Sequence, residues 1–426
     1  KGDGVHVYDD DGKEFIEGLA GLWSVSLGFG EQRLVDAATK QLQELPYYHT
    51  FGHKTAPPVI DLSERLVGIA PDGLTKAVFQ NSGSEAIDTA IKLVWYYHNA
   101  IDKPEKKKII ARVNSYHGTG IASASLTGLD RMHKAFDLPV TNRVLRTDCP
   151  HYYRFGEDGE TEEDFATRCA DNLEKLILDE GPDTVAAFFA EPVMGAGGVL
   201  VPAVTYFEKV QAVLKKYDVL MVSDEVICGF GRTGNMWGAQ TFGIKPDLLT
   251  CAKALSSSYL PISAVLVSEK IYEGIRDQSG DLGGFSHGYT YSGHPVPAAV
   301  AVETLKIYEE RDIVGQVRNV APALQDGLQA FADHPLVGEV RGVGLIAGVE
   351  VVADKATKEA FEPSAKVGPK IQALAEENGL LIRAMGDSIG FCPPLIINKE
   401  TIGEMMTRFA KTLDQTLAWA EAEKII

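Results

Sequence analysis

The chain has 426 residues, and its 59 acidic and 41 basic side chains give a formal net charge of −18 at pH 7. So acidic a protein repels a phosphate backbone, which argues against nucleic acid as a partner. The hydrophobic fraction of 45% is ordinary for a globular enzyme, and no uninterrupted apolar run reaches the roughly 18 residues that a membrane helix needs, so we expect no membrane span.

The first predicted element is a short β-hairpin, in which two strand-like runs flank the turn-forming cluster 10–12. Between residues 75 and 268, short apolar runs then alternate with helical patterns. This alternation indicates a mostly parallel sheet covered by helices on both faces. The one basic run, 106–108, is expected in a solvated turn. The hairpin strands are expected at 6–8 and 14–16, the later strands at 77–79, 109–111, 185–189, 219–222 and 264–267, and the clearest helices at 84–100 and 205–217.

After residue 308 the pattern changes to that of a smaller α+β unit. The expected elements are a polar helical stretch, a hairpin at 342–352, a helix at 364–378, strands at 380–384 and 389–392, and a closing helix from Lys399. We therefore predict an N-terminal segment, 1–50, that belongs to the small domain, a large domain, 51–310, and a C-terminal small domain, 311–426.

The five cysteines form an odd set without a CxxC pair, and most of them lie within apolar runs. This pattern favours reduced, buried thiols in a reducing compartment, so we expect a cytoplasmic protein. Residue 1 is Lys rather than Met, so we also expect a trimmed start that can hide a targeting segment.

The strongest chemical signal is an acid after one apolar strand and a lysine after the next. Asp224 ends the run 220–224, and Lys253 follows the run 248–252. Burial beside an apolar strand favours the neutral amine of Lys253, and the carboxyl ends of parallel strands are where α/β sheets bind ligands. The pair suits pyridoxal phosphate, with Lys253 as its Schiff-base lysine and Asp224 holding a proton on the pyridine nitrogen. A loop-capping Asp with a surface Lys is the alternative, and it is less favoured because other parts of the same site occur elsewhere in the sequence.

A phosphate-binding turn is the second part of this site. Residues 81–86 run from a strand through a Gly-containing turn into a helix that begins near Ser84. Backbone N–H groups at a helix start bind phosphate without a cation, which makes Ser82, Gly83 and Ser84 candidate ligands. An N-capping box formed by Ser82 and Glu85 explains the same residues equally well, and both roles can hold at once.

The run 114–118 again lies between a strand and a helix, and it places Tyr116 and His117 at the mouth of the sheet. We expect Tyr116 to stack on a pyridine ring and His117 to lie beside the cofactor, although packing roles are open for both. His49 and His53 have the i, i+4 spacing of some metal sites, but a glycine interrupts the pair and no carboxylate motif accompanies it. We expect no metal.

These motifs resemble those of the class III, or omega, aminotransferases of the fold-type I pyridoxal-phosphate enzymes, and the resemblance covers nearly the entire chain. The stretch 224–234 followed by Lys253 is specific to that class. The resemblance implies an α/β fold like that of aspartate aminotransferase, with a large pyridoxal-phosphate-binding domain built on a mostly parallel mixed sheet and a smaller α+β domain. It also implies that Lys253 is the general base, Asp224 the pyridinium partner and Val226 the apolar contact beneath the ring.

Two further residues enter through this resemblance. In the family, the threonine matching Thr290 in the run 289–295 reaches the phosphate of the neighbouring subunit. This implies a homodimer with shared active sites, and a tetramer is the larger alternative. Glu191 in the run 190–198 matches a carboxylate that the family keeps beside the cofactor. Whether Glu191 takes part in the chemistry or only braces its neighbours stays open.

Residues 22–25 and 383–387 resemble the amine:pyruvate, β-alanine:pyruvate and plant γ-aminobutyrate:pyruvate branch of the family. In those relatives, the arginine matching Arg383 binds the keto-acid carboxylate and swings away when an apolar amine occupies the pocket. Trp23 and Phe51 are expected to line that pocket. Arg232 lies in a loop that the whole class shares, and we interpret it as structural.

The resemblance implies a ping-pong transaminase that moves an amino group from an amine or ω-amino acid to a keto acid such as pyruvate or glyoxylate. A decarboxylase or aminomutase on the same fold is the nearest alternative, and it consumes no external keto acid. A nucleotide-binding dehydrogenase is less favoured because no GxGxxG fingerprint opens the first strand-to-helix turn. A non-catalytic binding module is weaker still, because two carboxylates, a lysine and a phosphate turn converge on one sheet edge.

Overall fold

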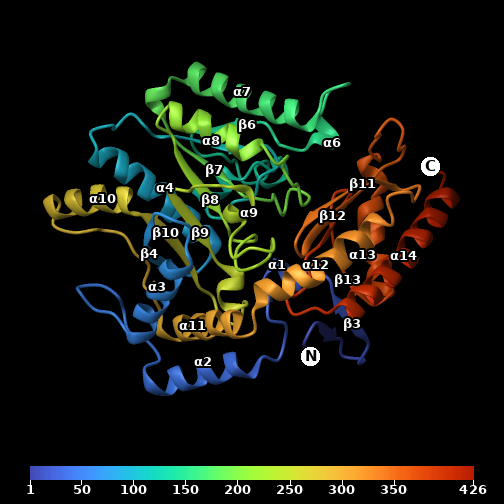
Figure 1. Cartoon of the computed structure of the whole chain (residues 1–426), viewed down its shortest axis with the longest axis horizontal. Coiled ribbons are helices and arrows are strands. Elements are labelled where there is room, and N and C mark those ends of the chain that lie inside the picture. The colour runs from blue at the N-terminus through green and yellow to red at the C-terminus, as the bar shows by residue number, and fades with distance from the viewer.

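A seven-stranded sheet forms the centre of the larger of two lobes (Figure 1). The computed structural model describes residues 1–426. Strand β10 runs antiparallel to both of its neighbours and the other pairs run parallel, so the sheet is mixed and mostly parallel, as predicted. The strand order is β4 (Leu74–Gln80), β10 (Ser263–Ser268), β9 (Leu248–Cys251), β8 (Leu220–Asp224), β7 (Val185–Ala190), β5 (Lys108–Arg112) and β6 (Val144–Thr147).

Helices cover both faces of this sheet, and alternate strand residues point to opposite faces. On β8, Leu220 and Val222 pack with helices α4 and α10, whereas Met221 between them packs in the main core with α7 and α8. Burial on both faces explains why the strands read as short continuous apolar runs. The helices of this lobe are α2 (Gln32–Glu44), α3 (Pro57–Ile69), α4 (Gly83–Ala100), α5 (Ile121–Leu126), α6 (Tyr152–Phe155), α7 (Glu162–Glu180), α8 (Tyr206–Lys216), α9 (Gly238–Phe242), α10 (Glu269–Asp281) and α11 (Pro295–Glu310), with the short helices η1 (Asp130–Met132), η2 (Pro182–Thr184) and η3 (Lys253–Ser256).

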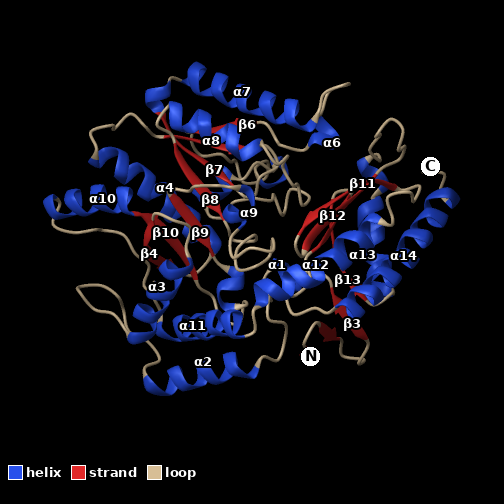
Figure 2. Cartoon of the chain, in the orientation of Figure 1, coloured by secondary structure: helices blue, strands red, loops and turns tan.

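The smaller lobe contains an antiparallel sheet with its own helices (Figure 2). The predicted hairpin at 342–352 is confirmed as the β11–β12 pair, although β11 begins earlier, at Val337. The closing helix begins at Lys399, as predicted. The sheet order is β11 (Val337–Val343), β12 (Ile346–Val351), β15 (Ser388–Phe391) and β14 (Arg383–Met385), and the helices are α12 (Ile313–Gln329), η4 (Pro363–Ala365), α13 (Val367–Glu377) and α14 (Lys399–Ala422).

The chain start joins the smaller lobe through a second sheet. The predicted hairpin is confirmed as the antiparallel pair β2–β3, and β3 pairs in parallel with β13 near the other end of the chain. Helix α2, in contrast, packs on α11 in the larger lobe (Figure 1). The domain boundaries at residues 50 and 310 remain our interpretation. This sheet consists of β1 (Gly2–Asp3), β2 (His6–Tyr8), β3 (Glu14–Glu17) and β13 (Leu380–Leu381), and α1 (Ala20–Trp23) follows β3.

Two sequence-based expectations need correction. The single strand expected at 380–384 is divided, because β13 pairs with β3 whereas β14 pairs with β15 in the other sheet. The basic run is not a solvated turn: the side chain of Lys106 is buried, and its ammonium group donates to the carbonyl oxygens of Val185, Tyr217 and Asp218 at 2.8–3.1 Å. A buried ammonium group loses its hydrogen bonds to water, and here three carbonyl groups replace them.

All five cysteines are buried and none forms a disulfide, as predicted. None of the helices combines the length and the apolar character that crossing a bilayer requires.

Candidate active site

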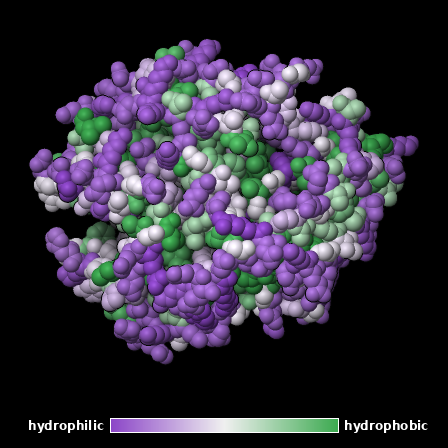
Figure 3. All heavy atoms as spheres, in the orientation of Figure 1, coloured by the Kyte–Doolittle hydropathy of each residue, from purple (hydrophilic) through white to green (hydrophobic).

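A cavity of about 380 Å³ lies at the carboxyl end of β8 and brings together residues from both lobes. In the view of Figure 3 most of the surface is hydrophilic, and hydrophobic side chains gather toward the middle of the face. All of the predicted site residues except Phe51 and Thr290 line the cavity, namely Trp23, Ser82, Gly83, Ser84, Tyr116, His117, Glu191, Asp224, Val226, Lys253 and Arg383.

Asp224 is the last residue of β8, and its carboxylate is held by hydrogen bonds on both oxygens. Oδ2 accepts from His117 Nδ1 at 2.8 Å, and Oδ1 accepts from the Val226 N–H at 3.1 Å and from the Thr250 hydroxyl at 3.3 Å. The side chain of His117 is fully buried. The donation from Nδ1 fixes the orientation of the carboxylate, so His117 acts on the site through Asp224.

Lys253 opens the turn after β9, and its backbone is in the left-handed region with φ 47°. Such a conformation is costly for a residue other than Gly and persists only where neighbours hold it. Tyr308 supplies one such restraint, since its hydroxyl donates to the carbonyl oxygen of Ala254 at 2.6 Å. Burial lowers the pKa of Lys253 to about 8, against the opposing charge of Asp224. A large neutral fraction near pH 8 makes this amine a competent nucleophile and base.

The turn before α4 combines capping with a free helix start. Ser82 is the N-cap, with its hydroxyl accepting from the Glu85 N–H at 3.2 Å, and the Glu85 carboxylate accepts from the Asn81 N–H at 2.7 Å. The capping box predicted from Ser82 and Glu85 is therefore formed only in part, because the Glu85 carboxylate accepts from the N–H of Asn81 and not from that of the N-cap residue Ser82. The first N–H groups of a helix have no partner inside the helix, so those of Gly83 and Ser84 remain suited to an anion in the cavity. A Cβ atom on Gly83 would lie 3.2 Å from Val226, and its absence leaves room on this side of the cavity.

Glu191 braces the loop that carries Tyr116. One oxygen of its buried carboxylate accepts from the Tyr116 N–H at 2.9 Å, and the other accepts from the Gly195 N–H at 3.0 Å. Burial raises the pKa of Glu191. Arg112, also buried, donates to the main-chain carbonyl oxygen of Glu191 at 2.5 Å. These bonds support the bracing role among the two roles that the sequence leaves open for Glu191.

Arg383 and Trp23 both line the cavity on the side of the smaller lobe. Arg383 lies in β14 opposite Gly390 of β15, and no ion pair or hydrogen bond occupies its guanidinium group. A Cβ atom on Gly390 would lie 2.9 Å from the Trp23 ring, which shows that the ring rests on this glycine. The half-exposed Leu22 joins them at the cavity wall. An unpaired guanidinium group thus lies beside an apolar surface.

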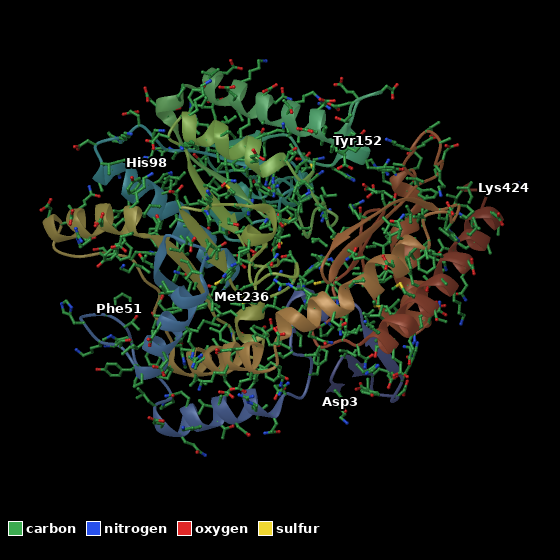
Figure 4. All side chains as sticks on the ribbon, in the orientation of Figure 1. Asp3, Phe51, His98, Tyr152, Met236 and Lys424 are labelled. Carbon is green, nitrogen blue, oxygen red and sulfur yellow. The ribbon has the colours of Figure 1, made fainter.

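Phe51 and Thr290 lie away from the cavity of their own chain. Phe51 is 46% exposed on a loop at the outer edge of the larger lobe (Figure 4). A Cβ atom on Gly288 would lie 3.0 Å from the Phe51 ring, and the exposed Thr290 accepts a hydrogen bond from Tyr47 on its carbonyl oxygen at 2.7 Å. The expectation that Phe51 lines the pocket is therefore not met within one subunit, because its loop lies at the outer edge of the lobe.

Some lining residues were missed by sequence reasoning. The loop after Lys253 contributes the largest group, and it gives no local signal because its serines and apolar residues resemble any turn. Arg232, interpreted as structural, is buried and donates to the carbonyl oxygens of Leu345 and Pro393 at 2.9 and 2.6 Å. The missed lining residues are Leu22, Asn81, Gly118, Ala196, Ile227, Ala252, Ser256, Ser258, Leu260, Pro261 and Ile262.

The groups around the cavity fit pyridoxal phosphate. Four groups surround one cavity: the amine of Lys253, the carboxylate of Asp224, the aromatic ring of Tyr116 and the helix start at Gly83. These groups match the aldehyde, the pyridine nitrogen, the ring face and the phosphate of that cofactor respectively.

Comparisons with known proteins agree with this geometry. The family model described as Aminotransferase class-III matches residues 1–413. The chloroplastic gamma aminobutyrate transaminase 3 of Solanum lycopersicum is 55% identical over 417 residues, which cover 98% of this chain and 80% of that protein. A structure named as a transaminase with L-Ala is 57% identical, with a TM-score of 0.97 and 98% of each chain covered. The omega transaminase of Pseudomonas jessenii in complex with PMP is 54% identical, with a TM-score of 0.97, covering 98% of this chain and 92% of that chain.

The fold expectation, an α/β architecture with a large and a smaller domain, is confirmed by these matches and by the two lobes. The chain therefore belongs to the class III aminotransferases, and it is a transaminase that uses pyridoxal 5′-phosphate to transfer an amino group from an amine or ω-amino acid to a keto acid.

Proposed function

We propose that this transaminase works in the amine:pyruvate direction, with pyruvate as the acceptor and an amine or ω-amino acid such as γ-aminobutyrate as the donor. The observation that carries the proposal is the unpaired guanidinium group of Arg383 beside the apolar ring of Trp23. A guanidinium group recognises a carboxylate in two-pronged fashion, whereas the ring suits an apolar donor. The relative named as a γ-aminobutyrate transaminase and the structure with L-Ala, the aminated form of pyruvate, support both halves.

The residues around the cavity would hold the cofactor and move one proton. When bound, pyridoxal phosphate supplies an aldehyde that condenses with amines and a ring that accepts electrons from the substrate carbon. Gly83 and Ser84 would hold the phosphate through N–H groups, Tyr116 would cover one ring face, and Val226 would contact the other. Asp224, oriented by His117 at 2.8 Å, would keep a proton on the ring nitrogen.

Lys253 is the base of the reaction in this proposal. Its Nζ would take the proton from the substrate carbon that bears the amino group and would then give a proton back at the end of the transfer. A pKa of about 8 suits both tasks near neutral pH, because the amine gains and loses a proton at little cost. Water would supply the oxygen of the aldehyde or ketone that leaves, and the keto acid would then bind with its carboxylate on Arg383 for the same steps in reverse.

We further propose a homodimer in which Thr290 and Phe51 of one subunit complete the active site of the other. Both residues are exposed and lie close together, and neither lines the cavity of its own chain. The same segment exposes Leu282, Phe285 and Tyr291, whose exposed fractions are 69%, 38% and 60%. Apolar surface of this extent is typical of an interface, and a tetramer would need a second such surface.

Substrate panels test the proposal directly. The holoenzyme is incubated with γ-aminobutyrate, β-alanine and an arylalkylamine as donors, each with pyruvate, glyoxylate or 2-oxoglutarate as acceptor, and the aminated product is measured. We expect one alanine for each donor consumed. Donor loss without stoichiometric use of a keto acid would instead indicate a decarboxylase or aminomutase, and a clear preference for 2-oxoglutarate would refute pyruvate as the acceptor.

We retain the cytoplasm as a prediction for the location of the protein. Five buried, unpaired cysteines support a reducing compartment. The tomato relative is named as chloroplastic, so fractionation of cells with antibodies against this chain must distinguish the cytoplasm from organelles.

A further inference from the structure

The turn that carries Leu22 and Trp23 to the cavity has a strained backbone. Ala20, Gly21 and Trp23 have φ values of 49°, 69° and 64°, and the first and last of these are not glycines. Left-handed residues with side chains are costly and survive only where surrounding groups hold them. The turn therefore needs an anchor.

Glu17 provides that anchor. It is the last residue of β3 and is 5% exposed, and one oxygen of its carboxylate accepts from the Leu19 N–H at 2.8 Å. The Gly21 N–H also faces the carboxylate. The Leu19 carbonyl oxygen in turn accepts from the Trp23 N–H at 2.8 Å. A short chain of hydrogen bonds thus leads from the Glu17 carboxylate through Leu19 to the backbone of Trp23.

The carboxylate of Glu17 has no counter-charge. It takes part in no ion pair, and the titratable group beside it is the buried thiol of Cys392, whose pKa burial raises. Burial raises the pKa of Glu17 to about 7, with the two N–H groups pulling in the opposite direction. A buried carboxylate without a cation is expensive, and packing alone would be served better by an apolar side chain. This points to a role at the cavity.

The position of the turn matters because of what Trp23 touches. Its ring rests on Gly390, where a Cβ atom would lie 2.9 Å from the ring, and Gly390 lies opposite Arg383 in the β14–β15 pair. A small displacement of the turn therefore changes the space beside the guanidinium group of Arg383.

We propose that Glu17 is a positioning residue for the donor substrate, whose carboxylate, through Leu19, holds the Trp23 ring beside Arg383 and so sets the width of the donor side of the cavity. The proposal rests on the substrate roles of Trp23 and Arg383 given above. Protonation of Glu17 removes one acceptor oxygen and relaxes the turn, so the position of the Trp23 ring changes with pH.

Fluorine NMR of 5-fluorotryptophan-labelled holoenzyme observes the ring without reference to catalysis. The chain has 4 Trp residues, and the Trp23 resonance is assigned by its loss in Trp23→Phe. We expect the Trp23 resonance of the wild type to titrate near pH 7 while the other resonances stay fixed. In Glu17→Gln, which keeps the size of the side chain but cannot ionise, the titration should disappear.

Asp247→Asn is the matched control. Asp247 is a half-buried carboxylate that accepts from the Met221 N–H at 2.9 Å, and it lies just before β9, at the opposite end of the strands from the cavity. This variant should keep the wild-type titration of Trp23. A Trp23 resonance that does not titrate in the wild type, or that still titrates in Glu17→Gln, would overturn the proposal.

Kinetics supply the second arm. Glu17→Gln removes the charge and replaces one acceptor oxygen by an NH2 group that cannot accept, so it should raise the KM of an arylalkylamine donor roughly tenfold, with a much smaller change in kcat. Gly390→Ala pushes the same ring from the other side, and it should shift the Trp23 resonance at every pH and also raise the donor KM. An unchanged donor KM in both variants would overturn the positioning role. Failure of the proposed substrate roles shows up separately, in the half-reactions of an Arg383 variant.

Discussion

At the scale of single residues, Lys253 has its amine and its backbone constrained by different neighbours. Burial lowers the pKa of the amine to about 8, whereas the left-handed turn is fixed by the Tyr308 hydroxyl, which bonds to the Ala254 carbonyl oxygen and lies 2.5 Å from the Ser26 hydroxyl. Tyr308 and Ser26 are both buried, so water does not compete for these hydrogen bonds. The backbone of Lys253 is therefore held in one position, while its amine can gain or lose a proton near pH 8.

The pKa of Lys253 predicts how fast the cofactor-free protein captures pyridoxal phosphate. Because only the neutral amine reacts, trapping with borohydride should quicken by about tenfold per pH unit below pH 8 and level off above it. Peptide mapping by mass spectrometry should place the label on Lys253. The half-exposed Lys270 offers a control, since Lys270→Ala should label like the wild type and Lys253→Ala should not. A main label on any other lysine would end this assignment.

Arg383→Ala should damage one half-reaction only. Losing one partner of a sheltered, charged hydrogen-bonded pair costs about 2 to 5 kcal/mol, or some tens- to thousands-fold. Amino transfer to pyruvate should fall by that factor, while an arylalkylamine should still aminate the cofactor at a near-normal rate. Single-turnover absorbance follows each half separately. Arg276→Ala, a half-exposed arginine paired only with Asp277, should change neither half. Equal damage to both halves would mean that Arg383 supports the fold.

The site residues that the sequence predicts are those with a local signal. Asp224 ends one apolar strand, Lys253 follows the next, and Ser82 precedes a helix as its N-cap. Glu17 gives no such signal, because it acts through the main-chain groups of Leu19, and because it lies where β3 pairs with β13 from the other end of the chain. In the sequence alone, a glutamate at the end of a strand cannot be distinguished from an exposed residue.

At the scale of elements, a buried arginine joins the two lobes. Arg341 of β11 donates to the carbonyl oxygens of Gly198 and Val199 in the loop after β7, and to Glu350 of β12 at 2.9 Å and Ser388 of β15 at 2.7 Å. Strand β14 lies at the edge of the same sheet. Helix α6, marked by Tyr152 in Figure 4, approaches this sheet from the larger lobe. The position of β14 relative to the larger lobe therefore depends on this network.

Removing the arginine should destabilise the protein in a pH-dependent way. Burial alone would raise the pKa of Glu350, but Arg341 and Ser388 hold it at about 2, below the usual 4.5. This carboxylate therefore stabilises the fold above pH 4.5, by about 3 kcal/mol, and the contribution is lost as the pH falls from 4.5 to about 2. Arg341→Met should lower the free energy of unfolding by about 3 to 5 kcal/mol at pH 7.

Denaturant titrations at several pH values measure this loss, and its difference from the wild type should shrink on acidification. Arg65→Met removes an arginine whose one ion pair, with Glu309 at 3.7 Å, lies at the surface, so its cost should stay below about 1 kcal/mol. A constant difference between Arg341→Met and the wild type from pH 7 to pH 3 would contradict the role given to Glu350.

At this scale, the sequence does not predict which strands pair with each other. The apolar periodicity predicts that residues 380–384 are extended, but it does not contain the information that β13 and β14 pair in different sheets. The Arg341 network is equally hidden, since Arg341 and Gly198 are separated by 143 positions in the chain. Most strands and helices were nevertheless predicted, because their burial on one or both faces leaves a periodic pattern.

At the scale of the whole molecule, the active site draws on both lobes and, in our proposal, on a second subunit. Trp23 and Arg383 come from the two ends of the chain, and both reach a cavity built on the central sheet. Phe51 and Thr290 remain exposed at the edge of the larger lobe. One copy of the chain leaves the phosphate side of its cavity without the threonine that the family resemblance assigns to it.

Subunit mixing tests whether Thr290 acts across the interface. Lys253→Ala lacks the amine that we propose as the base. Thr290→Glu places a carboxylate against the phosphate that Thr290 should contact, which should weaken cofactor binding strongly because like charges repel. Each variant alone should be nearly inactive. In a mixed dimer one site loses both residues and the other keeps both, so random assembly at equal amounts should restore about a quarter of the wild-type activity.

Two affinity tags allow the mixed dimer to be isolated and assayed after co-expression. The matched control pairs Lys253→Ala with the double variant that carries both substitutions, and it should remain inactive because no site then holds both intact residues. If Thr290 served the site of its own chain, the mixed dimer would have one site without the lysine and one without the threonine. No recovery in the purified mixed dimer would therefore place Thr290 in its own subunit's site, whereas a monomeric mass of the wild-type holoenzyme in solution would contradict the dimer itself.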